Sequence, residues 1–258
     1  MLNIVIPMAG RGSRFQEAGY SQPKPLIPVF EKPMIEVVIN NLRPSRPHRF
    51  VFVCQNSHLQ DYPLRELLSR AAPNCKILGI DGVTAGAACT VLLAAEFIDN
   101  DQSLMIANCD QWIRYDVDDY LQACDASGAA GFIMTMRADS SKWSYVRRDG
   151  QGKIVEVVEK EVVSDEATVG VYNFARGADF VQAACDMIAD NETSKGEFYV
   201  APTYCRLISA GHDVESLCIG DVHSSMYGLG TPDDLRHFLT LGMWDPSQPA
   251  ARRYKRSA

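Results

Sequence analysis

Hydrophobic runs alternate with helix-period segments along the first half of the chain. Five apolar runs have the length and residue types of buried strands, at residues 3–7, 49–54, 75–80, 103–107 and 130–136. Four segments between them have the period of amphipathic helices, at residues 33–42, 58–71, 86–97 and 117–124. This alternation is typical of βαβ units, so we predict an α/β fold with a mostly parallel mixed sheet flanked by helices.

The second half begins with a different pattern. Three short runs around an Asp-Gly-Gln-Gly turn predict a small antiparallel sheet, at residues 144–148, 153–158 and 168–174. The later elements are expected to be helices at residues 177–189 and 200–210, a strand at 214–219 and a helix from Thr231 to about Leu241. Because no internal repeat or low-complexity linker interrupts the chain, we predict one domain at residues 1–245 and a basic tail at 246–258.

Composition narrows the class of protein. The 258 residues are 47% hydrophobic and 22% charged, which is ordinary for a globular chain, and the net charge of −7 argues against a general nucleic-acid binder. The eight cysteines form no Cys-x-x-Cys pair, and the five histidines lack metal-ligand spacing, which argues against zinc. Without a secretory signal or a stretch near the ~18 apolar residues of a membrane helix, we expect a cytoplasmic protein with no membrane partner. The oligomeric state stays open, a homo-oligomer included.

The most informative segment is a glycine-rich, cationic loop after the first predicted strand. It reads Ala-Gly-Arg-Gly-Ser-Arg at residues 9–14 and is followed by Pro-Lys-Pro at residues 23–25. Glycines let backbone N–H groups approach phosphate oxygens. Arginine adds a planar, forked guanidinium, and lysine adds the point charge of its ammonium group. The loop therefore predicts a triphosphate site, with nucleotide-binding residues Ala9, Gly10, Gly12, Ser13, Arg14 and Lys24.

Two better-known glycine loops are excluded by their spacing. No Walker A string occurs, and the dinucleotide fingerprint would need a glycine where the chain has Phe15. A bare Gly-x-Gly is usually only a turn, but Arg14 and the Pro-Lys-Pro lysine favour phosphate binding.

Two other segments follow predicted strands. Asp110 follows the strand at 103–107, at the carboxyl end where ligands of open α/β sheets bind, and its carboxylate could hold Mg²⁺ or cap the next segment. The nearby cationic loop favours the metal. Small residues at 81–88 would let a flat base lie against Gly86 and Ala87, although the segment by itself favours an ordinary tight strand-to-helix turn.

The pattern as a whole resembles the nucleotidyltransferase family that includes the sugar-1-phosphate pyrophosphorylases. These are Rossmann-like proteins related in fold to the GT-A glycosyltransferases, and the resemblance runs from Ile4 to about Leu241. It is carried by the loop at 9–14 with Pro-Lys-Pro, and further by residues 86–87, 108–110, 159–160, 170–172 and 229–235.

The resemblance implies a role for each matching residue. Arg14 would bind the departing pyrophosphate, Lys24 would act near the reacting α-phosphate, and Asp110 would hold Mg²⁺, so these three are the expected catalytic residues. Gly86 would contact the base. The acceptor, a phosphorylated small molecule such as a sugar 1-phosphate, would meet Glu159, Lys160, Glu197 and Tyr199.

The implied chemistry agrees with these residue types. A phosphate monoester has a second pKa of about 6, so it is largely dianionic at pH 7 and needs no general base. Catalysis then consists of aligning two anions and screening their repulsion with Lys, Arg and metal. The product would be an activated precursor for surface polysaccharide.

Three positions depart from the family pattern. An aspartate that serves many pyrophosphorylases as a second metal ligand is Gly228 here, and the usual proline after Glu-Lys is Glu161. The segment at 196–202 resembles an offshoot in capsule and surface-polysaccharide pathways that includes CTP:phosphoglutamine cytidylyltransferase. Both the NTP and the acceptor therefore stay open, with a cytidylyltransferase acting on a non-sugar phosphate as the alternative.

Two other classes are weighed against this interpretation. A GT-A glycosyltransferase would carry an Asp-x-Asp motif, where the chain has Asn-Cys-Asp at 108–110, and would have no use for a pyrophosphate-binding Arg14. A non-catalytic regulatory relative would have lost Lys24 or Asp110. Only Gly228, which replaces the second metal ligand, favours a non-catalytic relative.

Overall fold

Residues 1–242 are described in the structure, a computed structural model, and their central sheet follows the order β12–β8–β11–β6–β1–β4–β5. The strands are β1 (Leu2–Pro7), β4 (His48–Gln55), β5 (Lys76–Ile80), β6 (Leu104–Ala107), β8 (Gly131–Arg137), β11 (Glu166–Phe174) and β12 (Val214–Asp221). All neighbouring pairs are parallel except those of β11, which runs antiparallel to both β6 and β8. The predicted mostly parallel mixed sheet is confirmed.

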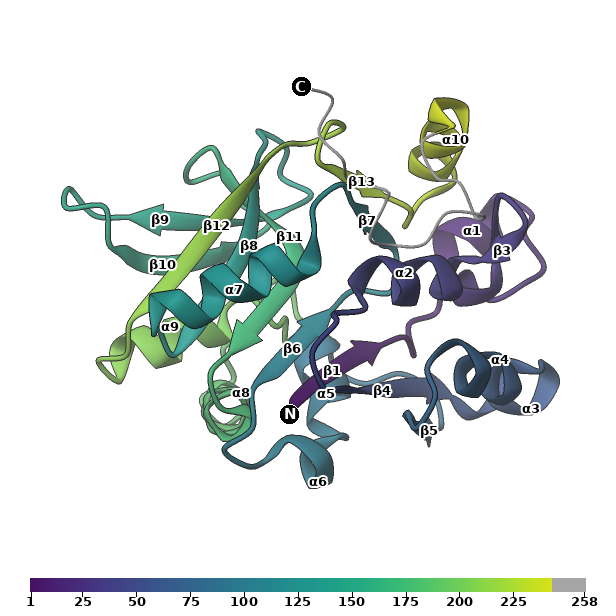
Figure 1. Cartoon of the computed structure of the whole chain (residues 1–258), viewed down its shortest axis with the longest axis horizontal. Coiled ribbons are helices and arrows are strands. Elements are labelled where there is room, and N and C mark those ends of the chain that lie inside the picture. The colour runs from purple at the N-terminus through teal and green to yellow at the C-terminus, as the bar shows by residue number, and fades with distance from the viewer. Residues whose placement is uncertain (243–258) are drawn as a thin grey trace.

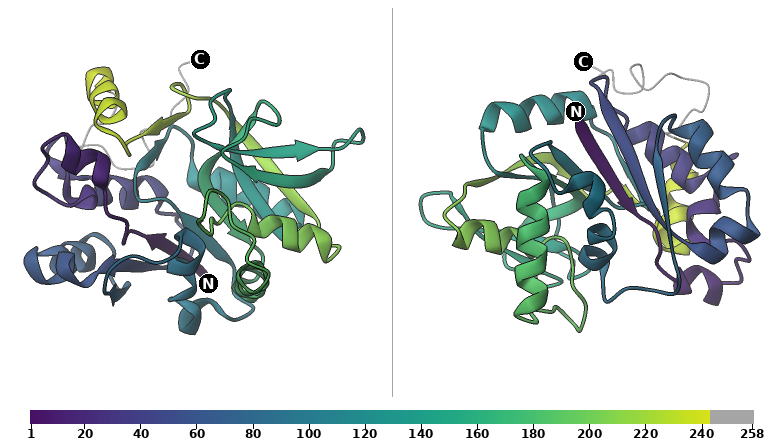
Figure 2. Two further views of the ribbon diagram at one scale, coloured as in Figure 1. Left: turned by 180° about the vertical axis from the view of Figure 1, so that it is seen from behind. Right: turned by 90° about the horizontal axis from the view of Figure 1, so that it is seen from below.

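Helices cover both faces of the sheet (Figures 1 and 2). One face packs against α2 (Met34–Leu42), α4 (Leu64–Ala71) and α7 (Val117–Ser127). The other packs against α5 (Ala87–Leu92), α6 (Ala95–Ile98), α8 (Gly177–Ala189) and α9 (Thr203–Ser209). Strand β1 is apolar from Ile4 to Ile6 because Ile4 and Ile6 enter the first core and Val5 enters the second.

Several boundaries differ from the sequence prediction. The helix expected at 58–71 is two helices, α3 (Asn56–Asp61) and α4, because Pro63 lacks an N–H and interrupts the ladder. The helix expected at 86–97 is divided into α5 and α6, and the helices expected from residues 33 and 200 begin at Met34 and Thr203. The sequence places the run at 168–174 in the small antiparallel sheet, but this run lies in the central sheet as part of β11 because β11 pairs with both β6 and β8.

A β-hairpin extends from the central sheet beside β11. It consists of β9 (Ser144–Arg148) and β10 (Ile154–Glu159), paired antiparallel as predicted. Its backbone joins the central sheet through one pairing, Ala167 of β11 with Tyr145 of β9.

Smaller elements close the side of the molecule near the glycine-rich loop. They are α1 (Ser13–Glu17), the 3₁₀ turn η1 (Lys24–Leu26), β2 (Pro28–Val29), β3 (Lys32–Pro33), β7 (Gln111–Ile113), β13 (Met226–Gly228) and α10 (Pro232–Leu241). Strand β13 pairs with β7, and Phe15, Trp112 and Phe238 share a separate apolar core there. Thr231 caps α10 by accepting the N–H of Asp234. The predicted domain boundary at 245 and the basic tail lie outside the described residues.

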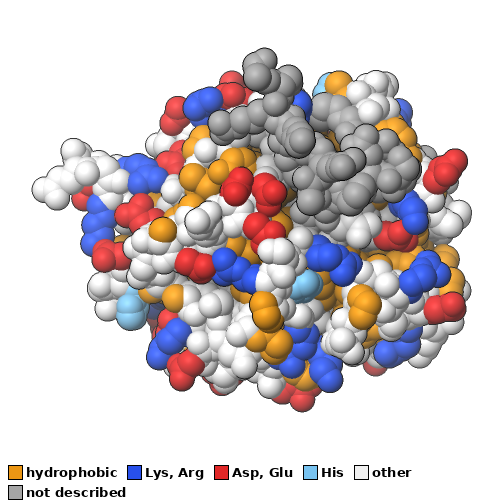
Figure 3. Space-filling view, viewed as in Figure 1, with side chains coloured by type: hydrophobic (Ala, Val, Ile, Leu, Met, Phe, Trp, Pro, Cys, Tyr) orange, Lys and Arg blue, Asp and Glu red, His pale blue; other side chains and the backbone are white. Residues whose placement is uncertain are grey.

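The surface of the described chain carries no single-sign face in the view of Figure 3, where Lys and Arg side chains are interspersed with Asp and Glu. Within residues 1–242, no helix has both the length and the apolar composition needed to cross a bilayer.

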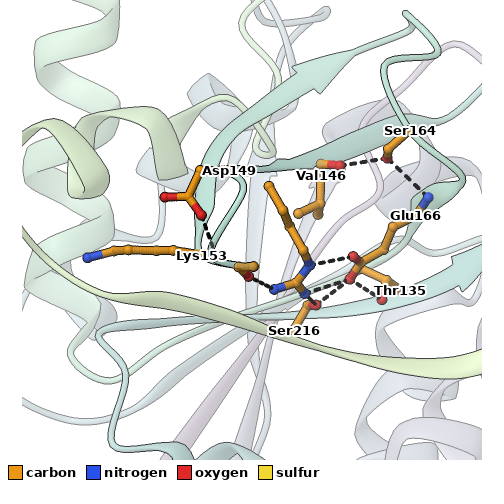
Figure 4. Close-up of polar contacts among 9 residues, drawn as sticks. Thr135, Val146, Asp149, Lys153, Ser164, Glu166 and Ser216 are labelled. Carbon is orange, nitrogen blue, oxygen red and sulfur yellow. Dashed lines mark hydrogen bonds and ion pairs between the residues drawn. The ribbon is translucent and has the colours of Figure 1, made fainter.

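A polar clamp of Arg148, Glu166, Ser216 and Thr135 fastens the hairpin to the sheet. Figure 4 labels Glu166, Ser216 and Thr135 in this clamp. Arg148 of β9 donates to both carboxylate oxygens of Glu166, at 2.9 and 3.1 Å, and to the Ser216 hydroxyl at 2.6 Å. Thr135 and Ser216 also donate to Glu166, so the clamp joins four strands. Burial alone would raise the pKa of the Glu166 carboxyl, but these donors outweigh it and hold the pKa below its ordinary value of 4.5.

Glu166→Gln should lower the free energy of unfolding by about 1–2 kcal/mol at pH 7, because charge-assisted hydrogen bonds to a mostly buried carboxylate are lost. A depressed pKa gives stability that is present above pH 4.5 and lost as the pH falls through the folded-state pKa. The difference between the two proteins in urea unfolding should therefore shrink below pH 4.5. Asp221→Asn is the control, since the Arg137–Asp221 pair is similarly two-pronged but exposed, and little change is expected. Equal effects of both variants would contradict the clamp.

Candidate active site

One cleft of about 1100 Å³ opens at the carboxyl ends of β1 and β6 and continues to the β9–β10 hairpin. Its volume exceeds what one small ligand needs, so it has room for two substrates. Every residue predicted for the site lines this cleft: Ala9, Gly10, Gly12, Ser13, Arg14, Lys24, Gly86, Ala87, Asp110, Glu159, Lys160, Glu197 and Tyr199.

The glycine-rich loop is held by the neighbouring strand β4. The N–H of Met8 donates to the carbonyl of Val53 at 2.8 Å, which continues the parallel ladder one residue beyond β1. Gln55, the last residue of β4, donates its side-chain amide to the carbonyl of Ala9 at 2.8 Å. With the Ala9 carbonyl turned toward Gln55, the loop after β1 is fixed at the floor of the cleft beside Arg14.

Lys24 and Asp110 face each other across this floor. Lys24 Nζ lies 2.8 Å from Asp110 Oδ2, and both side chains remain about a quarter exposed, at 22% and 25%. Burial lowers the pKa of the Lys24 ammonium, but the Asp110 carboxylate outweighs this and raises it above its ordinary value. Lys24 is therefore a fixed positive charge at neutral pH. Burial raises the pKa of the adjacent Cys109 to about 11, so its thiol is protonated there.

A bulge in β11 sets the position of Asp110. The carbonyl of Gly170 accepts the Asn108 N–H at 3.0 Å and the Gln111 amide at 3.1 Å, while Leu229 donates to the carbonyl of Asp110. Gly170 has φ +81, and a Cβ there would lie 2.2 Å from the Asn108 side chain. Only glycine fits this crossing. Three segments far apart in the sequence thus hold one carboxylate.

The predicted base loop packs against the segment that carries Tyr199. Phe198 donates its N–H to Ala85 and accepts that of Ala88, at 2.9 and 3.0 Å. Gly86 between them has φ +143, and a Cβ there would lie 2.3 Å from the Phe198 carbonyl oxygen. The close approach of this backbone explains the glycine. A flat base beside it is compatible with the space that the loop leaves in the cleft.

Gly86→Ala should lower the free energy of unfolding by about 1–3 kcal/mol. Alanine disfavours the positive φ of this position, and its methyl group would collide with the backbone of Phe198. Chemical denaturation measures this directly. Gly10→Ala is the control, since nothing lies within 4 Å of the added methyl group. Equal stability of Gly86→Ala and wild type would show that the two segments move apart freely.

The far half of the cleft holds an interlinked set of polar groups. Lys160 Nζ lies 4.0 Å from the centre of the Tyr199 ring, donates to its hydroxyl, and lies 3.9 Å from Glu159 Oε1. Glu159 accepts the hydroxyl of Ser144, the first residue of the hairpin. Burial raises the pKa of the Glu159 carboxyl and, together with Glu197, that of Tyr199, whose phenol therefore stays protonated at neutral pH.

Comparison with known proteins identifies the family. Residues 4–206 match the family model described as nucleotidyl transferase. The chain belongs to this family. The predicted enzyme class, a nucleotidyltransferase, is thereby confirmed.

Individual nucleotidyl transferase relatives are distant. The chain is 26% identical over 242 residues to the bifunctional protein GlmU of Thermodesulfovibrio yellowstonii, covering 91% of this chain and 50% of that protein. It thus spans about half the length of the curated relatives it matches. A nucleoside-diphosphate-sugar pyrophosphorylase from Vibrio cholerae RC9 superposes with a TM-score of 0.78 at 27% identity, covering 92% of this chain and 99% of that one. A UDP-glucose pyrophosphorylase bound to UDP-glucose, 15% identical with a TM-score of 0.72, shares the fold; 94% of this chain and 98% of that chain are covered.

The structure adds cleft residues that the sequence did not reveal. Asp234 lines the cleft and pairs with Lys142 at 3.5 Å, and a Cβ on Gly228 would lie 3.4 Å from its carboxylate. Gly230 passes so close to Asp110 that a Cβ would lie 2.4 Å from its Oδ2. Glu161 is exposed and does not line the cleft. No local pattern shows that Lys142 pairs with Asp234, because this pairing depends on how the β8–β9 connection meets α10.

Proposed function

We propose that this nucleotidyl transferase moves a nucleotidyl group from an NTP to a phosphorylated small molecule and releases pyrophosphate. The observation that carries the proposal is the arrangement of one cleft, with the glycine loop, Arg14 and the Lys24–Asp110 pair in one half and Lys160 in the other. The matched Vibrio protein is a nucleoside-diphosphate-sugar pyrophosphorylase, which supports a sugar 1-phosphate as acceptor.

In this mechanism an oxygen of the acceptor phosphate forms the new bond to the α-phosphorus, and the bond to the β-phosphate oxygen breaks. The electron pair of that bond leaves with pyrophosphate. No proton moves, because the acceptor is already a dianion at neutral pH. Lys24 screens the two anions beside the reacting phosphorus, and Arg14 accompanies the leaving group.

The residues of the cleft fit a Mg²⁺ ion that arrives with the nucleotide. Between residues 1 and 242 no cluster of three or more His, Cys, Asp or Glu could hold a metal alone. Mg²⁺ in phosphoryl-transfer sites is commonly bound by one or two carboxylates plus substrate phosphates and water. Asp110, partly exposed in the cleft, would supply that carboxylate. When bound, the ion would neutralise phosphate charge.

The nucleotide and acceptor are tested by one assay. Pyrophosphate release is measured with Mg²⁺ for CTP, dTTP, UTP, GTP and ATP against sugar 1-phosphates, phosphoglutamine and phosphocholine. Release with a sugar 1-phosphate would support a pyrophosphorylase supplying surface polysaccharide. Release with CTP and phosphoglutamine would support the capsule offshoot instead. A folded protein that binds no NTP would refute the proposal.

A further inference from the structure

Two carboxylates that line the cleft approach the same short stretch of backbone, Gly228-Leu229-Gly230. A Cβ on Gly230 would lie 2.4 Å from Asp110 Oδ2. A Cβ on Gly228 would lie 3.4 Å from Asp234 Oδ2. The Cα atoms of the two glycines are at most about 7 Å apart, because an extended chain spans no more than about 3.6 Å per residue. Asp110 and Asp234 therefore lie near each other, and each lies beside a position that has no side chain.

The carboxylate of Asp234 is turned toward the cleft rather than toward its own helix. Asp234 is the third residue of α10 after the cap Thr231, the position from which a glutamate commonly returns its side chain to the N–H of the cap. Among residues 1–242, the Asp234 carboxylate makes no bond of this kind, since Oδ1 lies 3.5 Å from Lys142 Nζ and Oδ2 faces Gly228. The Asp234 side chain thus contributes its charge to the cleft.

Each of the two carboxylates lies beside a lysine, but the two pairs differ in closeness. Lys24 Nζ is 2.8 Å from the Asp110 carboxylate, whereas Lys142 Nζ is 3.5 Å from that of Asp234. Lys142 also lies over the ring of Trp143, with its Nζ 4.7 Å from the ring centre. A long and partly exposed ion pair contributes little to stability, so a cation brought by a ligand can replace Lys142 beside Asp234 at little cost.

We propose that Asp234 is a second carboxylate for the Mg²⁺ ion that arrives with the nucleotide. The inference rests on the proposed function. Mg²⁺ in phosphoryl-transfer sites is bound by one or two carboxylates together with phosphates and waters, so a carboxylate can act through a bound water as well as by direct contact. Groups that act on a metal through another ligand commonly change its affinity by about 10–100-fold.

Asp234→Asn removes the charge and keeps the size of the side chain. Binding of Mn²⁺ is measured by electron paramagnetic resonance with the NTP that binds wild type most tightly in isothermal titration, so no turnover is needed. The dissociation constant for Mn²⁺ should rise about tenfold. Asp233→Asn is the matched control and should leave this constant unchanged, because Asp233 pairs with Arg236 and does not line the cleft.

A relocated carboxylate provides a second variant. Gly228→Asp, made in the Asp234→Asn protein, returns a carboxylate to the same place, because a Cβ at position 228 lies beside the Asp234 carboxylate. Gly228 is not among the glycines with positive φ, so its backbone accepts an aspartate. The affinity for Mn²⁺ should return to within about threefold of wild type. Thermal melting would establish that each variant is folded.

Lys142→Met distinguishes binding of the ion from loss of the ion pair. If Asp234 acted only by holding Lys142, this variant would weaken Mn²⁺ binding as Asp234→Asn does, whereas the proposal expects unchanged or tighter binding. Unchanged affinity in Asp234→Asn, or equal weakening in Lys142→Met, would overturn the role of Asp234. A wild type that binds no NTP would refute the proposed function instead. Mn²⁺ titration with pyrophosphate in place of the NTP would then decide Asp234.

Discussion

Lys24→Met should lower kcat by about 10²–10³-fold, the size of effect seen when one preorganised positive or hydrogen-bonding group is removed from a charged transition state. Methionine keeps the apolar stem of the side chain, which lies in the short turn η1 between two prolines, and removes only the ammonium. The raised pKa of Lys24 means that wild type carries this charge throughout the neutral range. Steady-state rates of pyrophosphate release would measure the loss.

The control for Lys24 is Lys32→Met. Lys32 also pairs with a carboxylate, Glu36 at 2.7 Å, but does not line the cleft, so its replacement should leave kcat unchanged. Circular dichroism and thermal melting would establish that both variants are folded. A folded Lys24→Met protein with a near-normal kcat would remove Lys24 from the mechanism.

Asp110→Asn should raise the Mg²⁺ concentration needed for half-maximal rate by at least about tenfold, because a carboxylate proposed for the ion is lost. The variant also removes the carboxylate that outweighs the effect of burial on the pKa of Lys24, so it changes the charge around Lys24 as well as the proposed ion site. A direct measurement of metal binding separates these two effects. Binding of Mn²⁺ in the presence of NTP, measured by electron paramagnetic resonance, gives a readout independent of rate.

Asp81→Asn is the control that tests whether loss of any carboxylate near the site changes the dependence of the rate on Mg²⁺. Asp81 follows β5 and accepts the side-chain amide of Asn56 at 2.9 Å, but it does not line the cleft. Its replacement should leave Mg²⁺ dependence unchanged. If Asp110→Asn behaved in the same way, the ion would have to be held elsewhere.

The sequence predicted those parts of the fold that local pattern controls. The apolar runs located the parallel strands, because a strand buried on both faces, such as β1 from Ile4 to Ile6, is apolar at successive positions. The sequence could not place β11, because a nine-residue strand has the same residue pattern whether it extends a hairpin or joins a central sheet. That choice depends on pairing with β6, about sixty residues earlier.

For the candidate site, the sequence predicted residues that line the cleft, but it did not predict the residues that support them. The loop residues and Asp110 follow strand ends, which share one edge of the sheet, and the structure brings all of them into one cleft. Gly170 and Gly230 are important because they have no side chain, which allows the side chains of Asn108 and Asp110 to lie against their backbone. Gln55 supports the loop by one hydrogen bond from its side-chain amide to the carbonyl of Ala9. Because such contacts join segments that are distant in the sequence, composition and motif spacing cannot predict them.

The β9–β10 hairpin meets the backbone of the central sheet at one pairing, Ala167 with Tyr145, and is held otherwise by side chains. It carries Ser144 and Glu159, and Lys160 follows it directly, whereas Asp110 follows the strand β6. Exposed side chains of the hairpin can therefore change without altering the backbone register of β1, β4 and β6. Under the function proposed above, the hairpin is the part of the fold in which preference for the acceptor can diverge between relatives.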